Sequence, residues 1–273
     1  MHPSEVLRIF EEKKSEYLRN IPSDIHPIGI LLGGQGAVGK GQLNLWAEQL
    51  FPDKEFLSIN GDIYRSRHPL FHELRKNVWD YSKSTQIFSN VFTERLIEEA
   101  VKASYSFIVE GTMRNSDVPI RTATMIRQNS YRSAAFVIAA PIEFSLLNIY
   151  NRYYRELQRK GFGRMVDLES HYAAVDGLPQ SLDRLYKEKA VDMIFIFDCF
   201  ARNRIKEYHL NEGEWDCSDM PSGIIYASRE EQLKDRETIS DLLMVGKDTI
   251  NGLDGEIKQQ AISAFNSLKG CEG

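Results

Sequence analysis

A glycine-rich segment that ends in a lysine offers the clearest chemistry in this sequence. Residues 34–40 read Gly-Gln-Gly-Ala-Val-Gly-Lys and match the first seven positions of the phosphate-binding loop pattern. Glycines let the backbone curl so that successive N–H groups point at phosphate oxygens, and the lysine bridges the terminal phosphates. The alternative is a glycine-rich turn that binds nothing. The residues expected to bind ATP are Gly34, Gln35, Gly36, Ala37, Val38, Gly39, Lys40 and Gly41.

The eighth position departs from the pattern. A serine or threonine there gives its hydroxyl to Mg²⁺, whereas this chain has Gly41. Either water takes that coordination position, because Mg²⁺ commonly keeps several waters, or the site binds nucleotide and turns over poorly. We expect a working enzyme in which Mg²⁺ is held mainly by phosphates and water, with no protein ligand assigned.

Asp62 is the first candidate for acid–base chemistry. It lies two residues after the end of the predicted strand over residues 55–60. The carboxyl end of such a strand lies at the sheet edge where ligands bind in open α/β folds. A kinase that acts on a hydroxyl needs a base to accept the hydroxyl proton, and aspartate commonly serves. The alternative is that Asp62 merely caps the next helix.

A second polar cluster follows the apolar run Phe107-Ile-Val. The run delivers Glu110 to the same sheet edge, where it could accept substrate hydroxyls or organise metal-bound water. Thr112 and Arg114 could hold an anionic substrate. The alternative is a strand that ends in an ordinary polar turn.

Two arginines complete the set of candidates. Arg152 lies in a long predicted helix, and Arg164 lies in the loop Gly161-Phe-Gly-Arg. Phosphoryl transfer places negative charge on equatorial oxygens, which arginines from a lid can neutralise. Gly161 and Gly163 would let such a lid close. The alternative for Arg152 is a solvated position on the helix surface.

Strands and helices alternate around these residues. Short apolar runs predict strands buried on both faces, and longer amphipathic runs predict helices. The alternation predicts an α/β fold of the P-loop kinase type, a mostly parallel sheet with helices on both faces. The predicted strands are 28–32, 55–60, 106–109, 134–140 and 191–197, and the predicted helices are 3–19, 42–50, 88–104, 118–128 and 142–160.

The alternation weakens beyond residue 203. Residues 206–228 are polar and rich in turn residues, while residues 229–269 resemble two polar helices broken near Gly252 and Gly255. We therefore predict a P-loop kinase domain with its N-terminal helix over residues 1–203. Residues 204–273 would form a polar, mainly helical C-terminal extension of that domain.

Composition excludes several classes of protein. The 273 residues are 42% hydrophobic and 27% charged, which is ordinary for a soluble globular chain. A net charge of −5 disfavours a nucleic-acid binder. The cysteines at 199, 217 and 271 have neither zinc-ligand spacing nor a disulfide pattern. The first residues form no signal peptide and the apolar runs are only strand-sized, so we expect no membrane span and a cytoplasmic location.

Four stretches together resemble the zeta toxin family of bacterial toxin–antitoxin kinases, which includes the PezT toxins. They are residues 31–40, 61–69, 108–114 and 117–125, the last reading Asp-Val-Pro-Ile-Arg-Thr-Ala-Thr-Met. The order and spacing of four motifs make the resemblance specific. It covers approximately residues 25–170, and the last third of the chain is not clearly matched.

The resemblance implies a kinase that uses ATP to phosphorylate UDP-N-acetylglucosamine at the 3′-hydroxyl of its amino sugar. In the family this depletes a cell-wall precursor and poisons growth. On matching positions, Lys40 would bind the ATP phosphates and Asp62 would be the catalytic base. Arg152 and Arg164 would stabilise the transferred phosphate, although the sequence around Arg164 is poorly matched. The sugar-nucleotide pocket would be lined by Glu94, Glu110, Thr112, Arg114 and Thr122.

The usual restraint in the family is a small helical antitoxin that blocks the ATP site. No segment of that size precedes residue 25, so we expect either a separate partner protein or an unusually mild toxin, which Gly41 favours. Two other hypotheses stay open. One is a P-loop kinase for another small hydroxyl substrate, and the other is a degenerate nucleotide-binding module that acts through partner binding.

Overall fold

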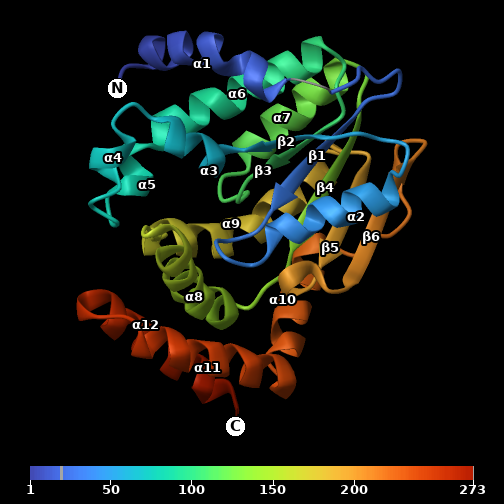
Figure 1. Cartoon of the computed structure of the whole chain (residues 1–273). Helices are drawn as coiled ribbons and strands as arrows, with labels where there is room; N and C mark the ends of the chain where they lie inside the picture. Colours follow the sequence, from blue (N-terminus) through green and yellow to red (C-terminus); the bar gives the residue numbers. More distant parts are fainter. Residues whose placement is uncertain (19–20, 273) are drawn as a thin grey trace.

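A seven-stranded sheet forms the centre of the part of the chain described by the computed structural model, residues 1–18 and 21–272 (Figure 1). The strand order is β2-β3-β1-β4-β5-β6-β7. The first five strands run parallel, and the pairings β5–β6 and β6–β7 are antiparallel. The bounds are β1 (Ile28–Gly33), β2 (Leu57–Asn60), β3 (Phe107–Glu110), β4 (Arg132–Ile138), β5 (Met193–Phe197), β6 (Arg204–Asn211) and β7 (Glu214–Trp215). The mostly parallel α/β sheet predicted from the sequence is confirmed.

The central strands are apolar along their whole length because helices cover both of their faces. All six residues of β1 are buried, as are the last six residues of β4. A strand with two buried faces has no polar side to present, so it appears in the sequence as an unbroken apolar run. That is why these strands could be predicted.

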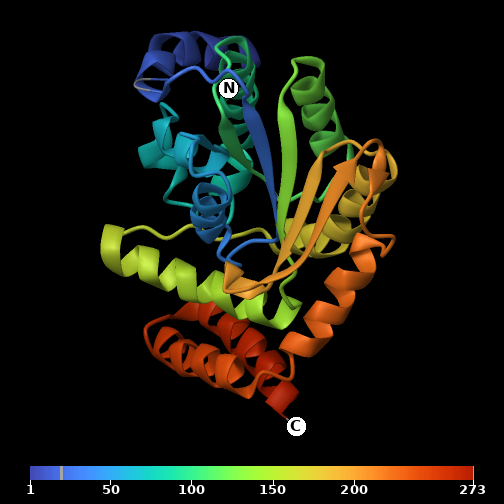
Figure 2. The same cartoon turned by 90° about the vertical axis from the view of Figure 1, so that its right-hand side faces the viewer.

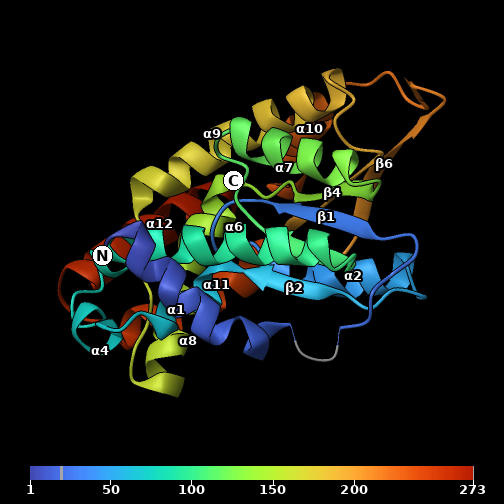
Figure 3. The same cartoon turned by 90° about the horizontal axis from the view of Figure 1, so that it is seen from above.

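Two groups of helices pack on the sheet. On one face lie α6 (Gln86–Lys102), α7 (Asp117–Gln128), α9 (Leu168–Lys187) and α10 (Pro221–Gln232), with α1 (Pro3–Tyr17) lying on α6. On the other face lie α2 (Leu43–Leu50) and α8 (Ile142–Lys160), with α11 (Arg236–Asn251) and α12 (Gly255–Lys269) packed on α8. Figure 2 shows the α11–α12 pair against α8, and Figure 3 shows α1 beside α6. Three short helices, α3 (Gly61–Tyr64), α4 (Phe71–Leu74) and α5 (Tyr81–Ser84), connect β2 to α6. No helix in the described ranges has both the length and the hydropathy needed to cross a bilayer.

The interpretation of residues 206–228 as merely turn-rich was wrong. Strand β6 begins at Arg204 and pairs with β5, and α10 begins at Pro221. Of the eight residues of β6, Tyr208 is the one that is buried, so the strand has no apolar run that could reveal it. The sheet therefore continues across residue 203, and the helical part begins with α10.

Helix α9 was not predicted because its interior contains Gly177 and Pro179, which normally interrupt helices. An added Cβ at Gly177 would collide with the backbone of Arg114, so the glycine lets α9 approach the segment after β3. The expected pair of C-terminal helices is confirmed in α11 and α12, which separate between Gly252 and Gly255.

The strand register brings the predicted site residues to one edge. Leu32 of β1 and Asn60 of β2 both pair with Glu110 of β3, so the three strands end at the same level. The chain leaves β1 into the glycine-rich loop and leaves β2 into the turn that contains Asp62. The loop, Asp62 and Glu110 therefore meet at the carboxyl edge of the sheet.

Candidate functional site

The glycine-rich loop curls at the end of β1. Positive φ angles occur at Gly34 (144°), Ala37 (63°) and Gly39 (88°). A Cβ at Gly39 would lie 2.9 Å from the Cα of Phe200, so both its backbone angle and its surroundings require glycine. The loop leads through a 3₁₀ turn, Lys40–Gln42, into α2. This is the strand–loop–helix context in which backbone N–H groups can cradle phosphate.

Lys40 is buried and folds back onto its own loop. Its Nζ donates to the carbonyl oxygens of Gly34 at 2.9 Å and Gln35 at 2.8 Å, and lies 3.8 Å from Oε1 of Glu110. Burial lowers the pKa of the Lys40 ammonium, while the carboxylates of Glu110 and Asp62 oppose that effect. The ammonium therefore stands at the junction of the loop and the carboxylates, where it can exchange carbonyl oxygens for phosphate oxygens.

Gly41 is not required by packing. A Cβ added there would meet no atom of the described residues within 4 Å, so a serine or threonine side chain would fit. Among the residues that the structure describes, no group of three or more His, Cys, Asp or Glu side chains is arranged to hold a metal ion.

Asp62 does not cap the helix that contains it, so the capping alternative was wrong. The side chain of Asn60 is the cap, and its Oδ1 accepts from the Asp62 N–H at 2.9 Å. The Asp62 carboxylate instead faces two guanidinium groups. Its Oδ1 lies 2.6 Å from Nη1 of Arg164 and 3.0 Å from Nε of Arg65. In the described part of the chain both contacts go to Oδ1, which leaves Oδ2 to accept a proton.

The two guanidiniums also determine the ionisation of Asp62. Burial raises the pKa of this carboxyl, but the charges and hydrogen bonds of Arg164 and Arg65 outweigh burial and hold the pKa well below its usual range. Asp62 is therefore ionised throughout the physiological range. An ionised carboxylate at the end of β2 can accept a hydrogen bond, or a proton, from a substrate hydroxyl.

Sequence reasoning missed the residues that orient these carboxylates. The Arg65 guanidinium donates to Ser82 O at 2.6 Å, Thr85 Oγ1 at 2.8 Å and Gln86 Oε1 at 2.9 Å. These bonds hold the guanidinium beside the Asp62 carboxylate. Asn60 Nδ2 donates to Oε2 of Glu110 at 2.6 Å. The position of Arg65 three residues after Asp62, on the same short helical turn, was the available signal.

Arg152 is half-buried as a residue, but its guanidinium is turned away from solvent, so the alternative of a solvated surface position was wrong. Its Nε and Nη2 are buried and have no hydrogen-bond partner among the described residues. Burial and the nearby charge of Arg164, opposed by the carboxylates of Asp62, Glu156 and Glu110, together lower the pKa of Arg152 to about 10. A buried guanidinium with unsatisfied donors is costly in isolation and would be stabilised by an anion.

Arg164 lies beside the end of α8. Its backbone N–H donates to Oε2 of Glu156 at 3.0 Å, and its guanidinium contacts Asp62. Gly161 ends α8 with φ 65°, and a Cβ at Gly163 would collide with the backbone of Tyr153. Local geometry therefore explains both glycines, whether or not the loop moves.

The charges in this cluster do not balance. Lys40, Arg65, Arg152 and Arg164 supply four positive charges against the three carboxylates of Asp62, Glu110 and Glu156. Such an excess of cations in a partly buried site attracts a polyanion and stabilises charge that develops during phosphoryl transfer.

The remaining predicted residues lie outside the cluster. Thr112 and Arg114 occupy the segment after β3, where Arg114 is exposed. Hydrogen bonds from Ser170 lower the pKa of Asp167, and the charge of Arg114 adds to that effect, which places Arg114 near the start of α9.

Glu94 and Thr122 lie on α6 and α7. Glu94 is exposed and its Oε1 lies 3.6 Å from Nη2 of Arg121, while the Thr122 hydroxyl donates to Val118 O at 3.0 Å within its own helix. In the described residues, none of their hydrogen bonds or ion pairs reaches the Lys40–Asp62 cluster. The structure therefore brings together Lys40, Asp62, Glu110, Arg152 and Arg164, but not Glu94 and Thr122.

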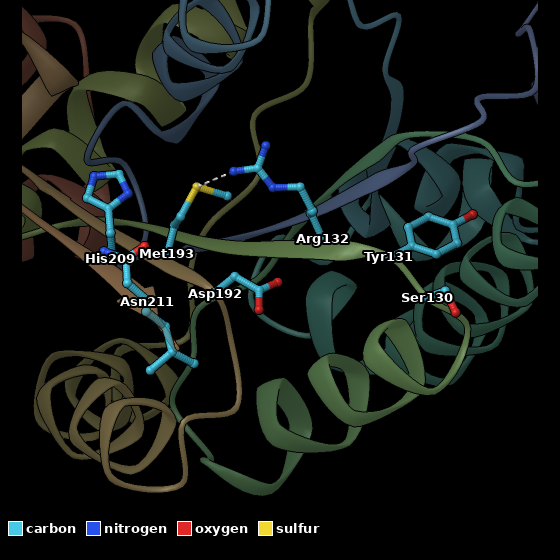
Figure 4. A pocket seen from close by; sticks show the side chains of 8 residues that line it. Ser130, Tyr131, Arg132, Asp192, Met193, His209 and Asn211 are labelled. Carbon is cyan, nitrogen blue, oxygen red and sulfur yellow. Dashed lines mark hydrogen bonds between the residues drawn. The ribbon is translucent and has the colours of Figure 1, made fainter. Parts of the chain in front are cut away.

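A surface hollow at the opposite, amino edge of the sheet is a separate feature (Figure 4). The side chains of Asp192 and Arg132, which line it, are engaged in structural bonds. Oδ2 of Asp192 accepts from the Ser133 N–H at 2.7 Å and from the Ser133 hydroxyl at 2.9 Å, and Arg132 Nη2 donates to Met193 Sδ at 3.5 Å. These bonds hold the starts of β4 and β5 together.

The parallel sheet, its glycine-rich loop and the cluster at its carboxyl edge define an α/β protein of the P-loop kinase type. The family model described as "Zeta toxin" matches residues 12–213. The chain belongs to the zeta toxin family, as its motifs predicted.

Individual relatives agree with this assignment. The chain is 32% identical to Toxin zeta of Enterococcus hirae over 187 residues, which cover 66% of this chain and 64% of that one. It is 28% identical to Toxin PezT of Streptococcus pneumoniae serotype 4 over 238 residues, which cover 86% and 90%. The match thus spans just under two thirds of the length of the first relative. A solved chain from the PezAT chromosomal toxin–antitoxin system of Streptococcus pneumoniae has the same fold, with a TM-score of 0.74 and 23% identity over 92% of this chain and 97% of that chain.

Proposed function

We propose that this chain is a kinase that transfers the γ-phosphoryl group of ATP to the 3′-hydroxyl of the amino sugar of UDP-N-acetylglucosamine. Membership of the zeta toxin family supports the proposal, because the resemblance seen in the sequence implies this substrate. The observation that carries it is the meeting of Lys40 with Glu110, and of Asp62 with Arg164, at one sheet edge. A loop for phosphates and a carboxylate for a hydroxyl are the two parts that such a reaction needs.

In the proposed reaction the sugar hydroxyl oxygen forms a bond to the γ-phosphorus of ATP. The bond between that phosphorus and the β–γ bridging oxygen breaks, and ADP leaves. Oδ2 of Asp62 accepts the hydroxyl proton while the hydroxyl attacks. Backbone N–H groups of residues 34–41 hold the ATP phosphates, and Lys40 turns from the loop carbonyls to the terminal phosphates.

The arginines serve the transferred group. Arg152 has buried donors with no partner among the residues that the structure describes, which makes it the better prepared of the two to receive phosphate oxygens. Arg164 contacts Asp62, so on ATP binding it can bridge the base and the transferred phosphoryl group. Drawing Arg164 toward phosphate would weaken its hold on Asp62 and make that carboxylate a stronger base.

Mg²⁺ neutralises phosphate charge when it is bound. Gly41 offers no hydroxyl, so phosphate oxygens and water would hold the ion, with Glu110 the carboxylate placed to order that water. Thr112 and Arg114, at the end of β3, would contact the sugar nucleotide. Glu94 and Thr122 would contact the sugar nucleotide only at the outer part of the pocket, between α6 and α7.

Purified protein incubated with ATP, Mg²⁺ and UDP-N-acetylglucosamine tests the proposal. ADP release and the mass of the sugar nucleotide are followed together. Asp62→Ala should lower turnover by about 10²- to 10⁴-fold, the usual worth of general base catalysis. Asp53→Ala is a matched control, because Asp53 is an exposed aspartate in the same part of the chain and should leave turnover unchanged.

The outcomes separate the hypotheses. A gain in mass of one phosphoryl group that Asp62→Ala abolishes supports the proposal. ADP release that does not depend on the sugar nucleotide indicates a kinase with another hydroxyl substrate. ATP binding without any turnover indicates the degenerate binding module, which the missing hydroxyl at Gly41 favours.

We also propose a cytoplasmic toxin that a small helical antitoxin restrains at the ATP site. The support is family membership and the structural neighbour from the PezAT toxin–antitoxin system. Expression of the wild type should arrest the growth of a bacterial host, and expression of Asp62→Ala should not. Equal growth of the two strains at high expression would contradict the toxin role.

A further inference from the structure

A buried polar stripe on α8 faces the glycine-rich loop. Ser145, Asn148 and Asn151 follow one another at intervals of three residues and are 0%, 6% and 1% exposed. Arg152 continues the stripe toward Asp62 and Glu110, whose charges act on it. Buried polar side chains on a helix are costly unless they make hydrogen bonds, so the stripe calls for a physical reason.

The stripe holds the loop at two points. Gln35, which is 0% exposed, donates from Nε2 to Ala140 O at 2.9 Å and to Ser145 Oγ at 3.4 Å. Asn148 Nδ2 lies 3.4 Å from Ala37 O. The side chain of Gln35 therefore ties the loop to the junction between β4 and α8.

His171 joins this network from α9. It lies in the first turns of that helix, is 1% exposed, and has Nε2 3.3 Å from Ser145 Oγ. The hydroxyl of Ser145 lies within donating distance of Ile142 O at 3.0 Å and of Pro141 O at 3.3 Å. Among the described residues Nδ1 of His171 is buried without a hydrogen-bond partner, so a proton on Nδ1 would leave a buried donor unsatisfied. We therefore assign the imidazole proton to Nε2, which donates to Ser145 Oγ.

The charged groups around His171 agree with this neutral form. Burial, together with the positive charges of Lys40 and Arg152, lowers the pKa of His171 to about 4. The imidazole is neutral near pH 7 and can donate one hydrogen bond. That bond goes to Ser145.

The network matters when Lys40 changes partners. In this structure Lys40 donates to the carbonyl oxygens of Gly34 and Gln35, which steadies the loop. An ammonium that turns to the phosphates of a nucleotide gives up those two bonds. The side chain of Gln35, held by Ala140 and Ser145, then remains as the anchor of that peptide segment.

We propose that His171 is a positioning residue for nucleotide binding, which acts through Ser145 and Gln35 to hold the phosphate loop in place when Lys40 turns to the phosphates. The inference rests on the proposed function, because it needs a nucleotide in the loop. It adds to that function a residue 136 positions beyond Gln35 in the sequence.

Titration calorimetry with ATP and Mg²⁺ tests the proposal. His171→Leu removes the donor, and Ser145→Ala removes the group that accepts from it. Each should weaken ATP binding about tenfold, as expected for one buried hydrogen bond with an unsatisfied partner. The double variant should be no weaker than the weaker single variant, because both act through one contact. In turnover assays the KM for ATP should rise by the same factor, while kcat at saturating ATP stays within about threefold.

Two variants provide controls. His171→Gln places an amide nitrogen near the position of Nε2 and should bind ATP within about threefold of the wild type. Ser133→Ala removes another fully buried hydroxyl, at the opposite edge of the sheet, and should leave ATP binding unchanged. Thermal unfolding of every variant distinguishes a role in stability from a role in binding. Substitution of a residue that serves stability alone would lower Tm without changing the Kd for ATP of the folded fraction.

ATP affinities of His171→Leu and Ser145→Ala within twofold of the wild type would overturn the inference and leave the proposed function intact. If His171→Leu does not fold, Ser145→Ala decides the matter in the same way. A wild type that does not bind ATP at all would overturn the proposed function and the inference with it.

Discussion

Replacing His171 with glutamine should remove an acid-sensitive part of the stability of this protein. His171 is 1% exposed, and burial with the charges of Lys40 and Arg152 lowers its pKa from 6.5 to about 4. In the unfolded chain the imidazole takes up a proton below pH 6.5, whereas in the folded chain it resists protonation until about pH 4. Between these values the unfolded state binds more protons, so the free energy of unfolding falls as the pH falls.

The size of the effect follows from the two pKa values. A tenfold change in proton affinity is worth about 1.4 kcal/mol, so the contribution of His171 is at most about 3 kcal/mol. It is fully present above pH 6.5 and is lost progressively down to about pH 4. Between about pH 7.5 and about pH 5, the wild type should lose about 2 kcal/mol more than His171→Gln, whose side chain does not titrate.

Urea unfolding of both proteins at the two pH values measures this difference directly. Other titrating groups, such as Asp62 and Asp24, are common to both proteins and cancel in the comparison. Ser181→Ala is a control, because it removes a buried hydroxyl bond to Met113 O from the same helix without removing a titrating group. Its loss of stability should be the same at both pH values. Parallel pH dependences for the wild type and His171→Gln would refute the burial argument.

Three further substitutions test the site. Gly41→Ser adds a side chain where a Cβ meets no described atom within 4 Å, so it should raise stability by a few tenths of a kcal/mol. It should also lower the Mg²⁺ concentration needed for half-maximal ADP release. An unchanged Mg²⁺ requirement would show that the missing hydroxyl is unimportant. Arg152→Met removes buried donors that have no partner in the described part of the chain, so urea unfolding should show stability equal to or above that of the wild type while turnover falls about 100-fold. A loss of stability would mean that the guanidinium has a structural role. Gly163→Ala should lower the free energy of unfolding by about 2 kcal/mol, because its Cβ would collide with the backbone of Tyr153. The matched variant Gly41→Ala should leave the free energy of unfolding undiminished. Equal Tm values for the two variants would contradict this packing.

The central part of the fold could be predicted from local patterns. Strands β1, β3, β4 and β5 are short, mainly apolar runs because both faces of the sheet are covered there, and the glycine-rich loop follows the first of them. Parallel strands end at one edge, so the polar residues after β2 and β3 could be expected beside the loop. The register of Leu32, Asn60 and Glu110 confirms that expectation.

Edge elements and interrupted helices escaped prediction for physical reasons. Strand β6 has one exposed side and carries alternating polar residues without a continuous apolar run. Helix α9 contains a glycine and a proline whose cost is offset by packing against the segment at Arg114. Tertiary contacts stabilise both elements, and local propensity does not report such contacts.

The sequence by itself determined the class of protein. Its evidence is local, because each motif is a short contiguous stretch of the sequence. These motifs are the glycine-rich loop with its lysine and the carboxylates that follow two apolar runs. Only the tertiary structure decided which other polar residues join them. An arginine on an amphipathic helix can be solvated or buried, and the burial of Arg152 became apparent only with α8 packed against the sheet. The contact of His171 with Ser145 crosses 26 residues, and that of Ser145 with Gln35 crosses 110, so no local pattern could join the three. Their roles depend on distances that packing alone sets.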